Sequence, residues 1–192
     1  MNLASDSVAD LVAALASTNR SLREDAAREL FRRGRTLAEG ATSSWRQIPE
    51  IAALLSDHVT VGIAVTPKRF SEIRAAFGNP RLADVPPDQD AEEFEWTLED
   101  DVHLDILTTS QAGGAGAIAR FLGKFGEGIQ QVEIVTGNVD RVTELLPSRL
   151  GVTPVYPSTR EGADGTHVNF FLVGAQQGGK VLIELVENRK RA

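Results

Sequence analysis

The sequence contains no cysteine, and this absence removes several classes of site at once. Without thiols there can be no disulfide bonds and no thiolate-bound metal, so any metal would have to be held by oxygen or imidazole ligands. Histidine is also scarce, with three residues in a chain of 192. Carboxylate, amide and hydroxyl groups are therefore the main candidates for binding chemistry.

The chain also lacks long apolar runs and an excess of positive charge. No apolar run approaches the roughly 18 residues of a membrane span. The net charge of -7 and the pI near 5.0 disfavour nucleic-acid binding, because phosphate recognition needs a concentrated cationic face. The N-terminal segment, MNLASDSVAD, lacks the basic region and apolar stretch of a signal peptide. We expect a soluble, cytoplasmic protein that binds neither nucleic acid nor membranes.

The first 57 residues are rich in alanine, leucine, arginine and glutamate and show no strand-like alternation. Ser21-Leu-Arg-Glu24 matches a capping box, which would start a helix. Apolar residues then recur at helical spacing as far as Phe31, and Gly34 is predicted to end this helix. We expect two or three amphipathic helices, which need a surface to pack on. A packing cap is the preferred interpretation of residues 1–57, and an independent partner-binding domain is the alternative.

The rest of the chain, residues 58–192, contains an internal repeat with copies at about 58–110 and 128–187. Each copy opens with an alternating strand, continues into an amphipathic helix and ends with another alternating strand. The predicted strands are 59–65, 94–98 and 103–107 in the first copy, and 130–136, 167–173 and 182–186 in the second. The predicted fold class is α+β: paired βαβββ units forming a curved mixed sheet around a cleft, plus an N-terminal α-helical extension.

Each copy carries one carboxylate at the centre of its last apolar strand. Alternation places Asp105 on the face opposite to Leu104 and Ile106. Glu184 has the same position in the second copy. A carboxylate in an apolar strand is costly unless it is solvated or paired. Two such residues at equivalent positions suggest a shared polar cleft, and the alternative is that each points into solvent from a one-sided sheet.

Two stretches of this module resemble a known family: GAIARFLGKFGEGIQQVEIVTGNVDRVTELL and GTHVNFFLVGAQQGGKVLIELVE. They resemble the second half of methylmalonyl-CoA epimerase-like proteins, in the vicinal-oxygen-chelate superfamily of glyoxalases, bleomycin-resistance proteins and dioxygenases. The part from FL through GEGI is also similar to hydroxyphenylpyruvate dioxygenase. The resemblance spans roughly residues 59–187. It implies a small-molecule cleft between the two halves, and a homodimer.

The resemblance also implies where a divalent metal would be held. In the superfamily the first and last strands of each half supply the ligands, typically His, Gln or Glu, His and Glu. The matching positions here are Thr60, Asp105, Gln131 and Glu184. Glu184 keeps the family residue and Asp105 keeps a carboxylate, whereas Thr60 and Gln131 stand in place of the two histidines.

These replacements change which metal the site would favour. Imidazole suits Fe, Zn, Co and Ni, whereas an all-oxygen set favours Mg, Ca or Mn. His103 is two residues from Asp105 on the same face, and His58 is two residues before Thr60, so a shifted site could include a histidine. The open interpretations are a metal-free site or a divalent metal (Mg, Mn, Ni, Co or Zn) with ligands from Asp105, Glu184, Gln131 and His103.

The region between Leu82 and Ile118 has ten acidic residues and no lysine or arginine. Such a run is usually a solvated face. In the epimerases a glutamate of this region is a base, so the resemblance implies that Glu93 abstracts a proton beside a carbonyl. The same acidity counts against a CoA thioester, whose phosphates need cations or a helix N-terminus. Arg120 and Lys124 are the nearest cations.

Three functions follow from these patterns. The first is a metal-dependent isomerase or lyase that acts on a small carbonyl or carboxylate compound, with Glu93 and Glu184 as catalytic residues. The second is a non-catalytic, resistance-type protein that binds a small molecule in the same cleft without metal. The third is a scaffold whose helical extension docks a partner. The missing histidines favour the second function over the first, and the two retained carboxylates keep the first open.

Overall fold

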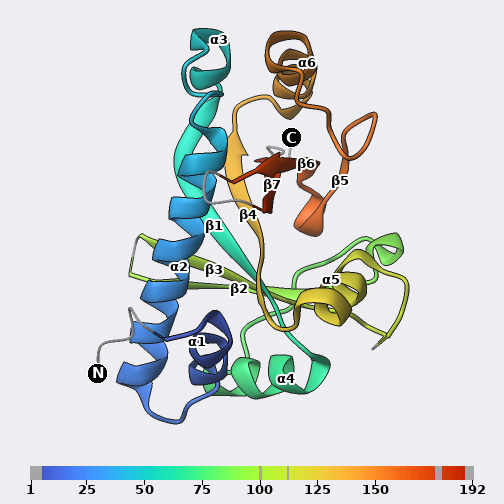
Figure 1. Cartoon of the computed structure of the whole chain (residues 1–192). Helices are drawn as coiled ribbons and strands as arrows, with labels where there is room; N and C mark the ends of the chain where they lie inside the picture. Colours follow the sequence, from blue (N-terminus) through green and yellow to red (C-terminus); the bar gives the residue numbers. More distant parts are fainter. Residues whose placement is uncertain (1–5, 100, 112, 176–178, 189–192) are drawn as a thin grey trace. The chain divides into compact units, whose positions relative to one another are not determined.

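The computed structural model describes residues 6–99, 101–111, 113–175 and 179–188 (Figure 1). Residues 1–5 of the predicted helical extension (1–57) and residues 189–192 of the predicted module (58–192) lie outside the described residues. The chain divides into two compact units, and each unit combines two stretches of sequence. The first unit is Met1–Gly34 with Thr60–Gln130, and the second unit is Arg35–Val59 with Gln131–Ala192. The predicted boundary near residue 57 stays a prediction.

Three helices form the N-terminal part of the chain: α1 (Val8–Leu15), α2 (Arg20–Thr42) and α3 (Pro49–Ala52). The capping box predicted at Ser21 is wrong, because Ser21 lies inside α2. The side chain of Asn19 accepts the N–H of Leu22 at 3.3 Å and caps the helix instead. A capping box does occur at α1, where Ser7 and Asp10 bond each other's backbone N–H groups.

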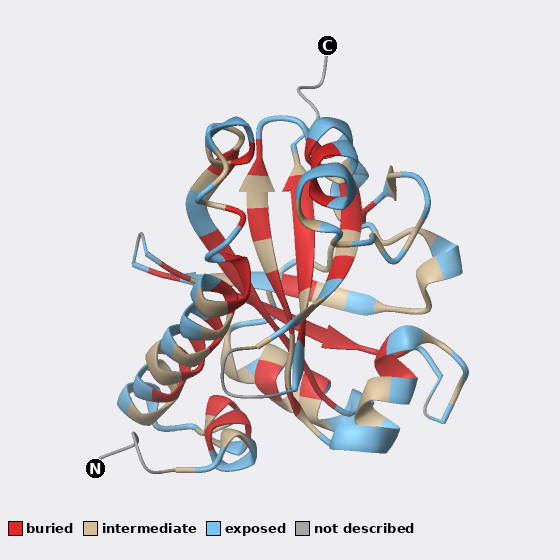
Figure 2. Cartoon of the chain, turned by 45° about the horizontal axis from the view of Figure 1, so that its top comes forward, coloured by how far each residue is buried: buried red, intermediate tan, exposed pale blue. Residues whose placement is uncertain are grey.

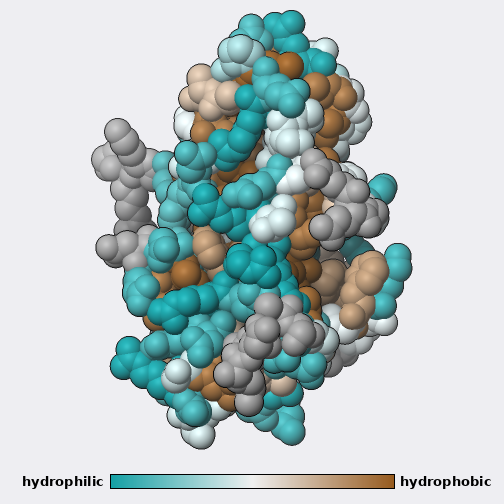
Figure 3. Space-filling view, turned by 60° about the vertical axis from the view of Figure 1, so that its left-hand side comes forward, coloured by the Kyte–Doolittle hydropathy of each residue, from teal (hydrophilic) through white to brown (hydrophobic). Residues whose placement is uncertain are grey.

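The helix end predicted at Gly34 is also wrong, because α2 continues for two more turns. A Cβ at this position would overlap the Val61 side chain on β1 (Leu55–Ala64). Gly34 therefore allows the helix and the strand to approach closely. Packing against the strand outweighs the cost of a glycine within a helix, which is about 1 kcal/mol. The exposed side of α2 is hydrophilic (Figure 3).

The first unit contains the end of β1 followed by α4 (Pro67–Ala76), η2 (Pro87–Gln89), β2 (Glu92–Leu98), β3 (Val102–Thr108) and α5 (Ala117–Phe125). Its strand order is β2-β3-β1, in which β2 runs antiparallel to β3 and β1 runs parallel to it. The copy is βαββ, since the described residues between α4 and β2 hold only the short η2 turn.

The second unit contains most of β4 (Gly128–Thr136) and then α6 (Val139–Leu150), β5 (Arg160–Glu161), η3 (Ala163–Gly165), β6 (His167–Gly174) and β7 (Lys180–Glu187). Its strand order is β4-β7-β6-β5, with β4 and β7 parallel and the other pairs antiparallel. This copy is a complete βαβββ unit. The predicted α+β class with a mixed sheet is confirmed, and seven strands take part in it.

Each unit has its own apolar core, and buried residues follow the strands (Figure 2). In the first unit Phe70 of α4 packs edge-on against Phe94, with ring centroids 5.2 Å apart. In the second unit the fully buried Trp45 packs edge-on against Phe171 at 5.6 Å. The N-terminal helices add Leu11, Leu15 and Leu30 to the first core and Ile51 to the second, and the turn between α2 and α3 adds Trp45 to the second. Described residues before β1 thus contribute buried side chains to both cores, and the packing-cap interpretation of residues 1–57 stays a prediction.

Candidate small-molecule site

Strand register in the first unit places Asp105, His103 and Glu93 on one face of the sheet. Asp105 is opposite Glu95 on β2 and Gly62 on β1. The three rows on this face are Glu93–Leu107–Ala64, Glu95–Asp105–Gly62 and Thr97–His103–Thr60, where Thr60 continues the register of β1 by one residue. The opposite face is apolar and packs on α4 through Phe94. The predicted site residues of this unit therefore lie together, away from that core.

Strand register in the second unit builds the equivalent face from β6, β7 and β4. Glu184 is opposite Phe170 on one side and Glu133 on the other. The three rows are Val168–Val186–Val135, Phe170–Glu184–Glu133 and Leu172–Leu182–Gln131. Gln131 pairs with the residue two before Glu184, and Thr60 has the same relation to Asp105. The two pairs that the internal repeat predicts are thus equivalent in register.

Gln131 and Glu184 are in direct contact. The Gln131 Nε2 donates a hydrogen bond to the Glu184 Oε2 at 2.5 Å, and each residue is 8% exposed. Burying a carboxylate is costly unless a donor compensates for the lost water, and the amide supplies that donor here. The amide keeps a second N–H and its carbonyl oxygen for other partners. The result is an oriented carboxylate beside a neutral donor.

The residues of the first unit have a different environment. Asp105 is 3% exposed and stands opposite Glu95, which is exposed. The ring of His103 lies 3.3 Å from the Thr97 hydroxyl. Glu93 is half-buried one row from Asp105. This face therefore has Glu93, Glu95 and Asp105 together, whereas the face of the second unit has an amide–carboxylate pair and Glu133 beside apolar side chains of β6 and β7.

The residues present do not fit the histidine-containing metal site of the superfamily. Both family histidines are replaced, and the N–H of Gln131 is directed at the carboxylate that the family uses as a ligand. His58 lies exposed in β1, so its position does not restore a buried ligand. Among the residues that the structure covers, no group of three or more His, Cys, Asp or Glu side chains is placed to hold a metal ion.

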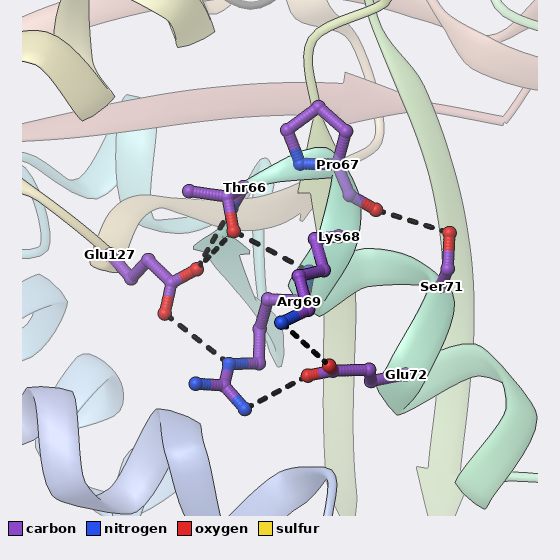
Figure 4. A network of polar contacts seen from close by, with 7 residues as sticks. All are labelled: Thr66, Pro67, Lys68, Arg69, Ser71, Glu72 and Glu127. Carbon is purple, nitrogen blue, oxygen red and sulfur yellow. Dashed lines mark hydrogen bonds and ion pairs between the residues drawn. The ribbon is translucent and has the colours of Figure 1, made fainter.

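The N-terminus of α4 in the first unit is occupied by the chain's own carboxylate (Figure 4). Glu127 accepts hydrogen bonds from the Thr66 backbone N–H at 3.0 Å and from its hydroxyl at 2.7 Å. The guanidinium of Arg69 lies 3.5 Å from the other oxygen of Glu127. Helix N-termini attract anions, and this one already holds an internal anion.

The two cations that the sequence analysis names as nearest to the acidic region also have partners. Arg120 donates a hydrogen bond to the Ala115 carbonyl, and the Lys124 ammonium lies over the Phe125 ring.

A pocket of about 200 Å³ lies elsewhere in the second unit, between the end of α2, the first half of β1 and the end of β4. Its two cations are already paired: Arg35 with Glu39 at 2.9 Å and Arg46 with Asp57 at 3.0 Å. Its floor includes Ile134, which belongs to the core side of the sheet. The pocket contains none of the predicted site residues.

Sequence analysis missed the side chains that surround Glu184. Phe170, Leu172 and Leu182 lie on its face, and Tyr156 packs against Phe170. The alternation of the strand 167–173 shows that Phe170 and Leu172 share a face. It does not show which residues of the last strand stand beside them, because strand register depends on the fold.

A scan against protein-family models finds no match. A search of curated proteins finds no match either. Solved structures do show similarity, and one is methylmalonyl-CoA epimerase from Mycobacterium tuberculosis. That protein is 28% identical, with a TM-score of 0.57, over 72% of this chain and 89% of its own.

Two further solved structures share the fold at lower identity. A variant of Streptomyces coelicolor methylmalonyl-CoA epimerase, in complex with 2-nitronate-propionyl-CoA, is 23% identical with a TM-score of 0.52, over 68% of this chain and 96% of its own. A hypothetical protein from Bacillus halodurans is 23% identical with a TM-score of 0.54, over 69% and 94%. The resemblance to the superfamily and to its epimerases is confirmed.

In the described part of the chain, no helix has the length and apolar character to cross a membrane.

Proposed function

Because the chain has the fold of the vicinal-oxygen-chelate superfamily, we propose that it binds a small carbonyl- or carboxylate-bearing molecule at Gln131 and Glu184. The observation that carries this proposal is the buried hydrogen bond between these two side chains. They stand at two of the four positions where the superfamily resemblance implies ligands of a divalent metal, which in that superfamily contacts the oxygens of the substrate. A carbonyl oxygen of the ligand would accept the second N–H of Gln131.

Calorimetric titration with two carbonyl probes tests this proposal. The probes are propionyl-CoA and methyl 4-acetylbenzoate, a neutral aryl ketone. We expect at least one probe to bind, and we expect Gln131→Leu to weaken that binding by about tenfold, because one hydrogen bond is worth about 1 kcal/mol or more. Glu144→Gln is the control, since Glu144 is an exposed carboxylate on α6. If neither probe binds, or if Gln131→Leu binds as the unmodified protein does, the proposal is wrong.

A catalytic role for Glu184 is the second candidate, supported by the similarity to epimerases. Glu184 would remove a proton from the carbon beside the bound carbonyl, and the electron pair of the C–H bond would move to the carbonyl oxygen. The Gln131 N–H would stabilise the resulting enolate. The proton on Glu184 exchanges with solvent, and a solvent-derived proton then returns to the carbon, which completes a hydrogen exchange with no oxidant or reductant.

Deuterium exchange tests this step, because the acetyl group of the aryl ketone has exchangeable protons beside its carbonyl. In D2O, NMR should show faster loss of the acetyl proton signal with the protein than without it. Glu184→Gln should abolish the acceleration, and Glu144→Gln should keep it. Acceleration that is lost in Glu93→Gln and kept in Glu184→Gln would instead identify Glu93 as the base.

A metal-dependent isomerase or lyase remains a separate proposal, since the superfamily resemblance implies a divalent metal. Metal analysis of the purified protein tests it together with the Asp105→Ala/Glu184→Ala double variant. Stoichiometric metal that is lost in the double variant would support it. Protein without metal and without affinity for Mn, Ni, Co or Zn would reject it.

The superfamily resemblance also implies a homodimer. Analytical ultracentrifugation of the purified protein tests this.

A further inference from the structure

An aromatic surface, formed by Phe170 and Tyr156, lies beside Glu184 in the second unit. Phe170 is directly opposite Glu184 across β6 and β7. The ring of Tyr156 packs edge-on against Phe170, with centroids 6.0 Å apart. The backbone N–H of Val155 donates to the Phe170 carbonyl at 2.7 Å and holds this segment beside β6. Tyr156 therefore supports the Phe170 ring in its place next to the carboxylate.

Two leucines continue the row of Gln131 across the sheet. Leu182 on β7 pairs with Gln131 on one side and with Leu172 of β6 on the other. Adjacent strands are about 5 Å apart, so Leu182 is one spacing and Leu172 two spacings from Gln131. Phe170 precedes Leu172 by two residues on β6 and shares its face. Apolar side chains thus border the Gln131–Glu184 pair on the side of β6.

These apolar side chains stay partly open to solvent. Leu172 is 51% exposed, and Phe170 and Leu182 are partly exposed. The opposite face of β6 is already covered, because Phe171 packs on Trp45. The exposed apolar side chains therefore belong to the site face and not to an incomplete core.

The hydrogen-bond donor of Gln131 lies close to this apolar area. Its Nε2 is 2.5 Å from the Glu184 Oε2, and Glu184 and Phe170 are paired neighbours on β7 and β6. A carbonyl oxygen that accepts the second N–H would lie about 3 Å from this nitrogen. Because adjacent strands are about 5 Å apart, a group joined directly to that carbonyl carbon reaches Leu182 and Phe170 without a linker.

We infer that the ligand of the second unit has an aromatic ring joined directly to its carbonyl carbon. The carbonyl oxygen accepts the second N–H of Gln131, and the ring lies on Leu182 and Leu172. The Phe170 ring then meets the ligand ring at its edge, in an arrangement that aromatic pairs favour. This inference rests on the proposed function, since it names the ligand class of the same site.

Three methyl ketones test the inference, because they share the acetyl group and differ only in the group joined to it. They are acetophenone, cyclohexyl methyl ketone and butanone, and NMR titration of the backbone amide signals measures their affinities. Acetophenone should bind at least tenfold more tightly than butanone, since its ring buries more apolar area. It should bind at least twofold more tightly than cyclohexyl methyl ketone, since aromatic pairs attract each other beyond the area that they bury.

Two variants assign this preference to the apolar area. Leu172→Ala should weaken acetophenone at least threefold and leave butanone within twofold, and the half-exposed position makes a folding defect unlikely to arise from the change. Phe170→Leu keeps an apolar side chain and removes the ring, so acetophenone and cyclohexyl methyl ketone should then bind equally. Phe125→Ala is the control, because Phe125 is a 65% exposed aromatic residue of the first unit, and it should bind all three ketones normally. Circular dichroism of each variant should match that of the unmodified protein.

The outcomes distinguish this inference from the proposed function. Binding of propionyl-CoA but of neither acetophenone nor methyl 4-acetylbenzoate, with weaker binding in Gln131→Leu, would overturn the inference and leave the proposed function standing. Acetophenone binding that Leu172→Ala does not change would also overturn the inference alone. Equal binding of acetophenone and cyclohexyl methyl ketone to the unmodified protein would overturn the aromatic assignment in favour of any apolar ring. Binding of none of the ketones, nor of propionyl-CoA, would overturn both.

Discussion

The two repeats have the same backbone plan and differ in the residues beside the carboxylate. In both, the first strand runs parallel to the last, and the last strand carries a buried carboxylate at the same register position. Asp105 has Glu95 and Gly62 beside it, whereas Glu184 has Phe170 and Glu133 beside it and accepts a hydrogen bond from Gln131. Register therefore defines where a site can be, and a few substitutions on one strand face decide what it can bind.

The difference also shows which half is the better candidate for recognition. A face that combines apolar side chains on β6 with a buried hydrogen-bonding pair can select the shape of a small molecule. A face that concentrates carboxylates needs a cation to offset their mutual repulsion. The second unit is therefore the half in which we propose that a ligand binds.

Removing one large core residue from each unit should have the largest effect on stability. Trp45→Ala in the second unit and Phe94→Ala in the first should each lower the free energy of unfolding by about 3–5 kcal/mol. Urea unfolding gives the size of each effect, and hydrogen exchange shows whether the strands of the altered unit lose protection first. Phe125→Ala is the control, since Phe125 is 65% exposed and its loss should cost well under 1 kcal/mol. Equal loss of protection in both units would show that they unfold together.

Gly34→Ala should destabilise the first unit by about 1–3 kcal/mol, because the new methyl group would overlap Val61. Thermal or urea unfolding measures the change. Gly123→Ala in α5 is a matched control, since its new Cβ would meet no atom within 4 Å. That control should raise stability by up to about 1 kcal/mol through helix propensity. A neutral Gly34→Ala would mean that the close contact with β1 relaxes at no cost.

Exchanging equivalent residues between the two faces tests directly which face binds the ligand. Phe170 and Glu95 are equivalent in register. Phe170→Glu should weaken the binding of methyl 4-acetylbenzoate by at least tenfold, about 1.4 kcal/mol, because it removes the apolar ring beside Glu184 and puts a charge in its place. Glu95→Phe should leave that binding unchanged. If Glu95→Phe weakens binding and Phe170→Glu does not, the ligand site belongs to the first unit.

The smallest expected effect is a pH dependence in the first unit. A hydrogen bond from Arg32, with a further contribution from Arg33, lowers the pKa of Glu29 from 4.5 to about 2. A lowered pKa means that the stabilisation is present above pH 4.5 and is lost as the pH falls toward 2. Since Arg32 is largely exposed, we expect about 1 kcal/mol or less. Glu29→Gln should remove this part of the acid dependence, and unfolding curves at pH 6 and pH 3 measure it.

The sequence predicts the fold better than it predicts the site. Alternation around Asp105 and Glu184 shows that each strand has an apolar and a polar side, and the repeat shows that the two positions are equivalent. The alternation follows from the period of two residues in each strand. The equivalence of the two positions follows from the internal repeat. The superfamily resemblance adds the class of fold, which the solved structures confirm.

What escaped prediction depends on contacts between distant parts of the chain. Gly34 is a normal helix terminator by local rules, and only the position of Val61 explains why α2 continues. The aromatic surface beside Glu184 depends on the register of β6 against β7 and on a loop that returns to the sheet edge. Neither has a local signal in the sequence.

Parallel pairing of the first and last strands has a consequence for how the chain is made. Val61 pairs with Leu104, and Gln131 with Leu182, so an opening strand leaves the ribosome about 40–50 residues before its partner. During that interval the early strand has unsatisfied hydrogen-bonding edges and an exposed apolar side, which promotes aggregation. Contacts this distant in sequence also slow folding. The helices that precede β1 are synthesised before it. Gly34 lets α2 lie close to β1, so α2 can cover one side of this strand before its partner strand is synthesised.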